Sequence, residues 1–380
     1  MNKVIMIFVM ITVIYGCDSK KGKIIHRDVK TYKIEVSDEH FFQWNNMVDR
    51  IDIIPLETTK SSLIGQFSKG IIDRQDVYLI DFRYQTLLNF DIHGKFKRKI
   101  GQKGKGPDDF LELRDFCVTD SIIYVLDYRK VHVYHKKTGK TLESWSFDTR
   151  NGFNPLNFVV FDSNNYFLWC SNPDVWDPNS GEYYRMRKMK KGKTDLEFFK
   201  YEYRLSDDPR FYPCIDRSYY MKPIDGEDIV YKLTKDSVSA SFAVDFGNKS
   251  LSPEKMVLLR NSKEPNAFLK SNAFKSISDI LDTEHYIYFT CSGPGAKTYE
   301  ALIHKETGEI QFGRWDYRRS PHFFFSDGNA LYGWYEPYML IANKYNAEDL
   351  NSCFSVIREG LPDLDEEDNL VLVKVYLKKQ

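Results

Sequence analysis

The chain has 380 residues, and its 54 basic and 54 acidic side chains give a formal net charge of zero. This balance argues against a nucleic-acid partner, because non-specific binding to phosphates needs a net positive field. Aromatic residues make up 15% of the chain. Their abundance favours a β-rich protein, since flat rings pack well on pleated surfaces.

The N-terminus has the pattern of a secretory signal, with Lys3 as a cationic start and an apolar run from Val4 to Ile14. The run is shorter than the roughly 20 apolar residues that a membrane-spanning helix needs. It ends at Ile14-Tyr15-Gly16-Cys17, which resembles the lipobox read by bacterial lipoprotein signal peptidase. We therefore predict a signal peptide over residues 1–16 and a lipid on the thiol of Cys17. Ordinary signal cleavage is the alternative, and it also exports the protein.

The clearest signal further along the chain is a repeat. The pattern Tyr-x-x-Asp-aromatic-Arg occurs from Tyr78 to Arg83 and again 46 residues later, from Tyr124 to Arg129. In both copies a strand, a Gly-Lys turn and another strand follow. A weaker copy and three further proposed units bring the count to six. They span 284–312, 158–199, 219–246 and 322–342.

Units of about 40 to 50 residues with several short strands are typical of β-propeller blades. Such a ring must close, and the strands at Arg50–Leu56 and Leu370–Tyr376 are the natural closing pieces. Ser252 followed by Pro253 predicts the capped start of a short helix between two blades. The predicted fold is all-β: a six-bladed β-propeller with N- and C-terminal strands that close the ring and a few short decorating helices.

Six segments, in order along the chain, carry a resemblance to a known family. They are Ile53-Ile54-Pro55-Leu56-Glu57-Thr58-Thr59, Leu63-Ile64-Gly65, the run from Lys99 to Phe110, the run from Asp228 to Leu233, Asp245-Phe246-Gly247 and Leu370-Val371-Leu372-Val373. With them the chain resembles the six-bladed β-propeller lipoproteins with NHL-like repeats of Bacteroidota-type bacteria. The resemblance implies a propeller fold and a cell-envelope location, and little about chemistry, because most members have no established activity. We expect a signal peptide (1–16), a lipidated tether (17–30) and a propeller domain (31–380).

Candidate ligand-binding residues stand at matched ends of the repeated strands. Arg83 with Tyr84, and Arg129, follow the repeated aspartate and could present guanidinium donors to a carboxylate or a sugar hydroxyl. Alternatively, each arginine stacks on the neighbouring blade and pairs with Asp81 or Asp127. The sequence leaves both readings open.

Neither a metal site nor a cofactor is predicted. Apart from Cys17, the five cysteines are widely spaced and show no Cys-x-x-Cys pair. His132 and His135 are the closest histidines, and their odd spacing on a strand sends them to opposite faces. The run from Gly101 to Pro107 lacks the Gly-Lys-Ser/Thr ending of a phosphate-binding loop, so we expect a connection between blades there.

Trp334 and Tyr335 are further candidates, as a sugar-stacking platform or as packing between the late blades. These observations predict a non-catalytic binding module that holds a protein, peptide or glycan on a propeller face. We expect it in the cell envelope, lipid-anchored to the outer membrane and facing either the periplasm or the cell surface. The alternative is a metal-dependent hydrolase, lactonase or lyase at the channel mouth, which would need carboxylates and a His or Asn converging on the axis.

Overall fold

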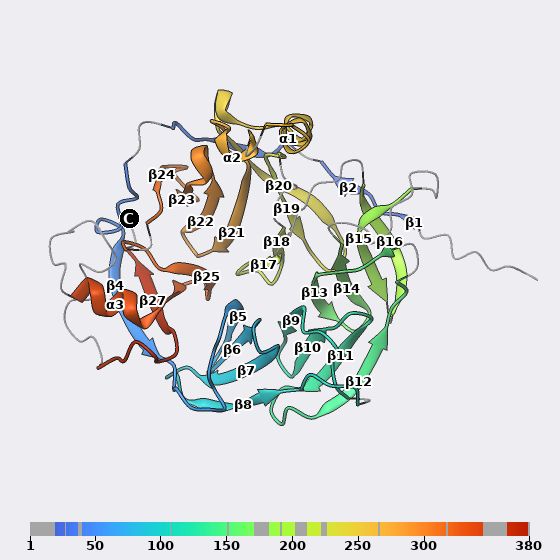
Figure 1. The fold of residues 1–380 in the computed structure, drawn as a ribbon. Coiled ribbons are helices and arrows are strands. Elements are labelled where there is room, and N and C mark those ends of the chain that lie inside the picture. The colour runs from blue at the N-terminus through green and yellow to red at the C-terminus, as the bar shows by residue number, and fades with distance from the viewer. Residues whose placement is uncertain are drawn as a thin grey trace, which may run out of the picture.

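The computed structural model describes residues 20–378 except 27, 37–39, 107, 150–151, 171–181, 191, 202–210, 222–225, 265–266, 317 and 345–362. The predicted signal peptide and Cys17 lie outside the described residues. Six sheets stand around a central axis (Figure 1), and the predicted six-bladed β-propeller is confirmed. No helix within the described residues is long and apolar enough to cross a bilayer.

Five blades are continuous in sequence, and each has four antiparallel strands that run from the axis outward. Blade 1 contains β5 (Phe67–Asp73), β6 (Asp76–Asp81), β7 (Thr86–Asp91) and β8 (Phe96–Ile100). Blade 2 contains β9 (Asp115–Val118), β10 (Ile122–Leu126), β11 (Lys130–His135) and β12 (Thr141–Ser146). Blade 3 contains β13 (Asn157–Asp162), β14 (Asn165–Trp169), β15 (Tyr184–Lys190) and β16 (Lys193–Lys200).

The next two blades follow the same plan. Blade 4 contains β17 (Phe211–Pro213), β18 (Tyr219–Met221), β19 (Ile229–Leu233) and β20 (Val238–Asp245). Blade 5 contains β21 (Ser276–Asp282), β22 (Tyr286–Ser292), β23 (Thr298–His304) and β24 (Ile310–Arg314). The innermost strands of adjacent blades contact one another around the whole ring.

Blade 6 joins segments that are far apart in sequence and closes the ring. Its strands are β25 (His322–Ser326), β26 (Ala330–Tyr335), β27 (Val371–Leu377) and, outermost, β4 (Val48–Pro55). The C-terminal β27 pairs antiparallel with the N-terminal β4, from Val371 opposite Pro55 to Tyr376 opposite Arg50. The two predicted closing strands are therefore confirmed.

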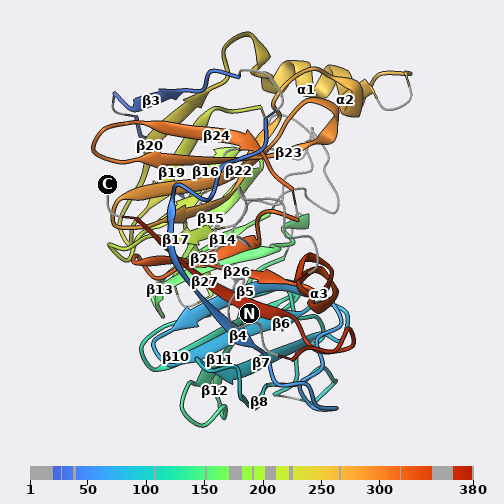
Figure 2. The same cartoon turned by 90° about the vertical axis from the view of Figure 1, so that its left-hand side faces the viewer.

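Ahead of β4, the N-terminal segment runs along the outer edges of blades 3 to 5. Strand β1 (Lys20–Lys21) pairs parallel with β16, while β2 (Ile24–Ile25) and β3 (Lys30–Lys33) pair parallel with β20. Figure 2 shows β3 beside β20 at the rim. A bridge between Phe41 and Arg314 continues the path along blade 5. Part of the segment expected to be a tether is thus hydrogen-bonded to the propeller.

In the described residues, three helices decorate one face of the ring, which we call the top face (Figure 2). They are α1 (Pro253–Arg260), α2 (Ala267–Lys270) and α3 (Pro337–Lys344), and two short 3₁₀ turns span Gly247–Lys249 and Pro294–Ala296. The hydroxyl of Ser252 accepts a hydrogen bond from the backbone N–H of Lys255 at 3.4 Å, which caps α1 as predicted. The β6–β7 connection and the described connections between blades lie on this same face, and the β5–β6 turn lies on the opposite, bottom face.

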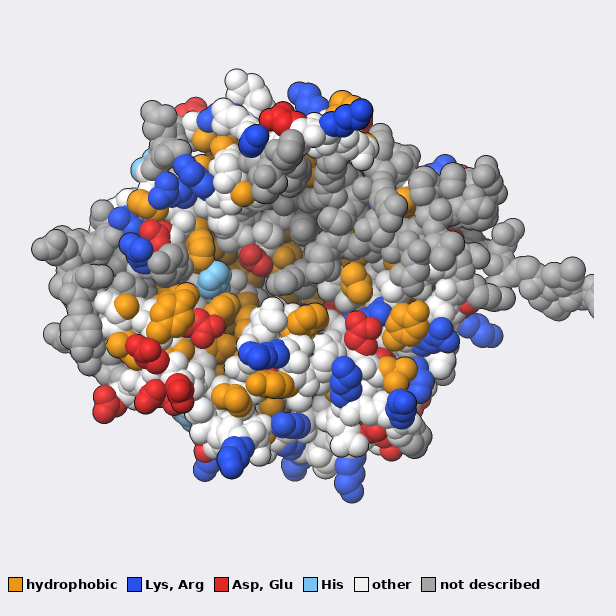
Figure 3. Space-filling view, in the orientation of Figure 1, with side chains coloured by type: hydrophobic (Ala, Val, Ile, Leu, Met, Phe, Trp, Pro, Cys, Tyr) orange, Lys and Arg blue, Asp and Glu red, His pale blue; other side chains and the backbone are white. Residues whose placement is uncertain are grey.

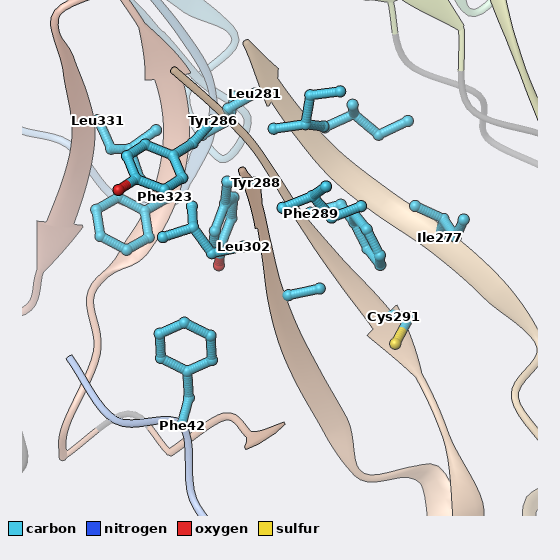
Figure 4. Packing of buried hydrophobic residues seen from close by; sticks show 14 of the residues in the cluster. Phe42, Ile277, Leu281, Tyr286, Tyr288, Phe289, Cys291, Leu302, Phe323 and Leu331 are labelled. Atoms are coloured by element: carbon cyan, nitrogen blue, oxygen red, sulfur yellow. The ribbon is translucent and has the colours of Figure 1, made fainter. Parts of the chain in front are cut away.

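The hydrophobic core lies between neighbouring blades. The second strand of blade 1 is buried on both sides, so it reads as the apolar run Val77 to Ile80, whereas the outermost β12 is largely exposed. In the largest cluster, the ring centroid of Phe323 in blade 6 lies 5.1 Å from that of Tyr288 in blade 5. Figure 4 shows this pair together with Phe42 of the N-terminal segment. Burying each such side chain contributes about 1.5–3 kcal/mol.

Candidate functional site

The innermost strands of all six blades line a cavity of about 180 Å³ on the axis. Its lining is mainly apolar and aromatic, with a few polar side chains among them. Lining residues include Lys69, Ile71 and Asp73 of β5, Cys117 of β9, Phe158 of β13, Phe211 and Tyr212 of β17, Asp279 of β21, and Phe324 and Phe325 of β25. A concave, largely apolar site with a small number of polar groups is the usual form of a ligand pocket.

Five half-buried rings form what we call the aromatic row, at the channel margin between blades 5, 6 and 1. The ring of His322 lies between two tryptophans, with centroids 4.5 Å from Trp315 and 4.7 Å from Trp334. Trp334 continues to Phe67 at 5.4 Å, and Phe67 reaches Phe324 at 5.1 Å. None of these rings is fully buried, so the row offers apolar surface next to the channel. Figure 3 shows hydrophobic side chains gathered around the hollowed centre of this face.

The electrostatics of the row keep His322 uncharged. Burial lowers the pKa of His322, and the carboxylate of Asp279 opposes that shift only in part. The imidazole is therefore mainly neutral at pH 7, and it can stack while it donates one hydrogen bond and accepts another.

Asp279 itself has a strained backbone. Its φ is +50°, in the left-handed region, at a bulge in β21. Its backbone N–H donates to the hydroxyl of Tyr212 at 2.8 Å, and its carboxylate accepts from Thr290 at 2.8 Å. Strain of this kind is found preferentially at binding sites, because the surrounding structure must hold it in place.

On the other side of the channel a polar chain ties three blades together. The ammonium of Lys69 in blade 1 donates to the carboxylate of Asp115 in blade 2 at 2.6 Å, and the same carboxylate accepts the backbone N–H of Phe158 in blade 3 at 3.0 Å. Asp115 is only 2% exposed, and its two oxygens are both hydrogen-bonded. The buried carboxylate of Asp115 is therefore fully paired, which is the condition for tolerating a charge in a core.

A second hollow of about 300 Å³ adjoins the channel on the top face. It shares Lys69 and Phe211 with the axial cavity and opens beside Phe82, Leu156 and Arg114. The guanidinium of Arg114 is held by the carbonyl of Pro155 at 2.9 Å and by the carboxylate of Glu112 at 2.9 Å. Paired charges and apolar side chains therefore stand together at this opening, which suits a segment that carries both apolar and polar groups.

The arginines predicted from the repeat are exposed on the top face, in equivalent connections of blades 1 and 2. Arg83 and Tyr84 lie between β6 and β7, and Arg129 lies between β10 and β11. The repeated aspartates instead bind backbone groups. The carboxylate of Asp81 accepts hydrogen bonds from the backbone N–H groups of Gly65 at 2.9 Å, Gln66 at 3.1 Å and Arg83 at 2.9 Å. The carboxylate of Asp127 accepts hydrogen bonds from the backbone N–H groups of Leu111 at 3.2 Å, Glu112 at 2.9 Å and Tyr128 at 2.6 Å.

The two late aromatic candidates have different environments. Trp334 belongs to the aromatic row, whereas Tyr335 is 1% exposed and packs in the core. Sequence reasoning missed His322 and Phe324. The signal that could have found them is the run His322-Phe323-Phe324-Phe325 on an innermost strand, in which half-buried and buried aromatic side chains alternate.

One set of side chains has the composition of a catalytic triad. His132 Nδ1 lies 3.1 Å from the hydroxyl of Ser144, and its Nε2 lies 3.4 Å from Asp127. The histidine is fully buried, and Ser144 stands on the outermost strand of blade 2, away from the channel. Asp127 is already bound by three backbone N–H groups, so this array ties β11 to its neighbours. No cluster of three or more His, Cys, Asp or Glu side chains suited to a metal occurs within the described residues.

The chain is similar to proteins of known fold, although a comparison with curated proteins gives no match. A Bacteroides fragilis protein described as exported shares 15% identity and superposes with a TM-score of 0.74, covering 92% of this chain and 99% of that one. A member of the DUF4221 family from Bacteroides vulgatus shares 13% identity, with a TM-score of 0.54, 88% of this chain and 99% of that one. These likenesses concern the fold. Residues 31–376 match the family described as a domain of unknown function, DUF4934, and the chain belongs to that family.

Proposed function

We propose that this protein is a cell-envelope lipoprotein, anchored through Cys17, whose top face binds a protein or peptide partner without catalysing a reaction. The lipobox-like sequence before Cys17 supports the anchor, and the likeness in fold to a Bacteroides fragilis protein described as exported agrees with an envelope location. The distribution of exposed apolar side chains supports the binding face.

Large hydrophobic side chains that remain exposed gather on one side of the ring. Of nine such residues in the described part of the chain, seven lie in top-face connections. The seven are Leu63, Phe82, Tyr84, Leu111, Leu156, Leu258 and Tyr338. Ile215 lies on the bottom face and Leu142 on an outer strand. A concentration of apolar surface on one face marks an interaction site.

The chemistry of this face favours a polypeptide. Aliphatic side chains such as Leu111 and Leu156 stand among its aromatic ones, and arginines such as Arg83 and Arg129 stand beside them. Aromatic residues and arginine are enriched in protein interfaces and supply most of the binding energy. A glycan would use the aromatic row but would gain little from the leucines.

Two residues of nearly equal exposure allow a direct test. Phe82 on the top face is 54% exposed, and Ile215 on the bottom face is 52% exposed. A photo-crosslinking amino acid is placed at each position in the full-length protein, in its own cells, and adducts are read by mass spectrometry. We expect a defined protein adduct at position 82 and none at 215. Equal adducts at both positions would refute the assignment of the face, and a glycan adduct at 82 would replace the peptide ligand.

A further inference from the structure

The outer edge of blade 3 lies next to the point where the chain would enter the membrane. Strand β1 begins at Lys20, which pairs with Leu196 on the outermost strand of this blade. Cys17 precedes Lys20 by three residues. An extended chain advances at most about 3.6 Å per residue, so the two Cα atoms are no more than about 11 Å apart. Any lipid on Cys17 therefore holds this edge close to the bilayer.

The same edge is basic. Among the described residues, the exposed lysines of this edge are Lys20, Lys21, Lys23, Lys190, Lys193 and Lys200. Glu182 binds two of them, Lys21 at 2.7 Å and Lys200 at 2.9 Å. The remaining four, which we call the lysine edge, form no ion pair in the part of the chain that the structure describes. The exposed carboxylate of Asp195 is too little to neutralise them.

The lysine edge and the anchor point share one corner of the blade. Lys193 precedes Leu196 by three residues on β16, which is about 10 Å along a strand. Lys190 lies opposite Lys193 across the tight turn between β15 and β16. A residue tethered within about 11 Å of Lys20 is thus in the same region as these ammonium groups.

We propose that the lysine edge docks on the anionic phospholipid surface of the membrane that holds the Cys17 lipid, an inference that rests on the proposed lipidation. Clustered lysines beside a lipid anchor are attracted by anionic headgroups within a Debye length of the surface. The acyl chains retain the protein, and the lysines set its orientation. The propeller then stands edge-on, with the channel axis along the membrane plane, and the top face stays open to a partner.

The test is a lysine footprint of the full-length lipoprotein in vesicles. Protein purified from membranes is reconstituted into neutral phosphatidylcholine vesicles or vesicles that also contain phosphatidylglycerol, and is acetylated with a water-soluble ester. We expect reactivity at Lys20, Lys23, Lys190 and Lys193 to fall about fivefold in the anionic vesicles and to recover at high salt. The exposed Lys99 of blade 1 and Lys140 of blade 2 are internal controls whose reactivity should not change.

A matched pair of variants separates charge from position. One variant carries K20Q, K23Q, K190Q and K193Q, and the other carries K95Q, K99Q, K137Q and K140Q on blades 1 and 2. Lys21 and Lys200 remain in both as reporters on the blade 3 edge. Their protection in anionic vesicles should disappear in the first variant and persist in the second.

The mass of the N-terminal peptide shows whether Cys17 carries a lipid, so it separates a failure of the anchor from a failure of the docking. A lipidated peptide with no footprint at the lysine edge would overturn the docking and leave the anchor standing. Equal protection of Lys99 and Lys140 would also overturn it, because another face would then meet the membrane. A peptide without lipid would overturn the anchor and this docking together, while the top-face crosslink would still stand or fall on its own.

Discussion

Blades 1 and 6 reach the same four-stranded arrangement by different routes. Blade 1 is continuous from residue 67 to 100, and turns of two to four residues join its strands. Blade 6 combines 322–335 with 371–377 and 48–55, so it cannot form until the two ends of the chain meet. The second route carries a larger loop-closure cost, which specific contacts at the junction must offset.

Different polar side chains hold blade 1 together and join the chain ends at blade 6. In blade 1, Asp81 accepts only backbone N–H groups, which lie close in sequence. At the closure, Asn369 accepts the N–H of Ile64 at 2.9 Å and donates to the carbonyls of Glu57 at 2.9 Å and Ser62 at 3.0 Å. An amide can do both, so it joins two distant segments where a carboxylate could not. Non-local closure therefore depends on one buried amide more than a local blade depends on its capping acid.

The largest expected effect is at that amide. Asn369→Ala leaves buried carbonyl and N–H groups without partners, and we expect the free energy of unfolding in urea to fall by about 3 kcal/mol. Asn329 is the control in the same blade, because it is exposed and only its backbone N–H is bonded, to Asp327 at 2.9 Å. Asn329→Ala should cost less than about 0.5 kcal/mol. Equal losses of stability in the two variants would contradict a special role for Asn369 in closing the ring.

The next effect concerns the junction of blades 5 and 6, where a carboxyl group is fully buried. Glu300 accepts hydrogen bonds from Ser320 at 2.8 Å, Tyr288 at 3.1 Å and the indole of Trp44 at 3.3 Å. Burial raises its pKa to about 8, against the opposing effect of these donors. The native state therefore holds a proton that the unfolded chain releases above about pH 4.3.

The sign of the pH dependence follows from that proton. Native protein binds more protons than unfolded protein between about pH 4.3 and 8, so stability falls as the pH rises through this range. Glu300→Gln removes the titration, and its urea stability relative to the parent should rise by roughly 2 kcal/mol from pH 5 to pH 6.5. Parallel stability curves for the two proteins would show that Glu300 is ionised in the fold.

The sequence predicts best the features that are local. The Tyr78 and Tyr124 repeats locate blades 1 and 2, and the Ser252 cap locates α1, because each pattern lies within a few residues of the structure it specifies. The two closing strands are also recognised, since only terminal apolar strands can complete a ring.

Contacts between segments far apart in the chain cannot be predicted from a local sequence pattern. Strand β1 is Lys20-Lys21, which has no apolar periodicity, and its partner near Leu196 lies more than a hundred residues away. The aromatic row joins rings from three blades, so no regular spacing of aromatic residues along the chain predicts it. The repeated Asp81 suggested an ion pair with Arg83. The carboxylate binds backbone N–H donors instead, because these are already fixed in place, whereas ordering an exposed arginine costs side-chain entropy.

The smallest effect tests whether the capping acid is replaceable in a local blade. Burial alone would raise the pKa of Asp127, but the His132 side chain and three backbone N–H groups hold it below its usual value. The stabilisation by the Asp127 carboxylate is present above about pH 4 and is lost as the pH falls through the lowered pKa.

In the variant Asp127→Asn, the amide oxygen can keep the two shortest contacts, to the N–H groups of Glu112 and Tyr128. The amide nitrogen then faces the N–H group of Leu111, whose contact is longer. We expect a loss of about 1 kcal/mol at pH 7 that shrinks towards pH 2, measured by urea unfolding. Asp195→Asn on the exposed edge of blade 3 is the control, and a loss at Asp127 as large as that at Asn369 would erase the distinction between local and non-local closure.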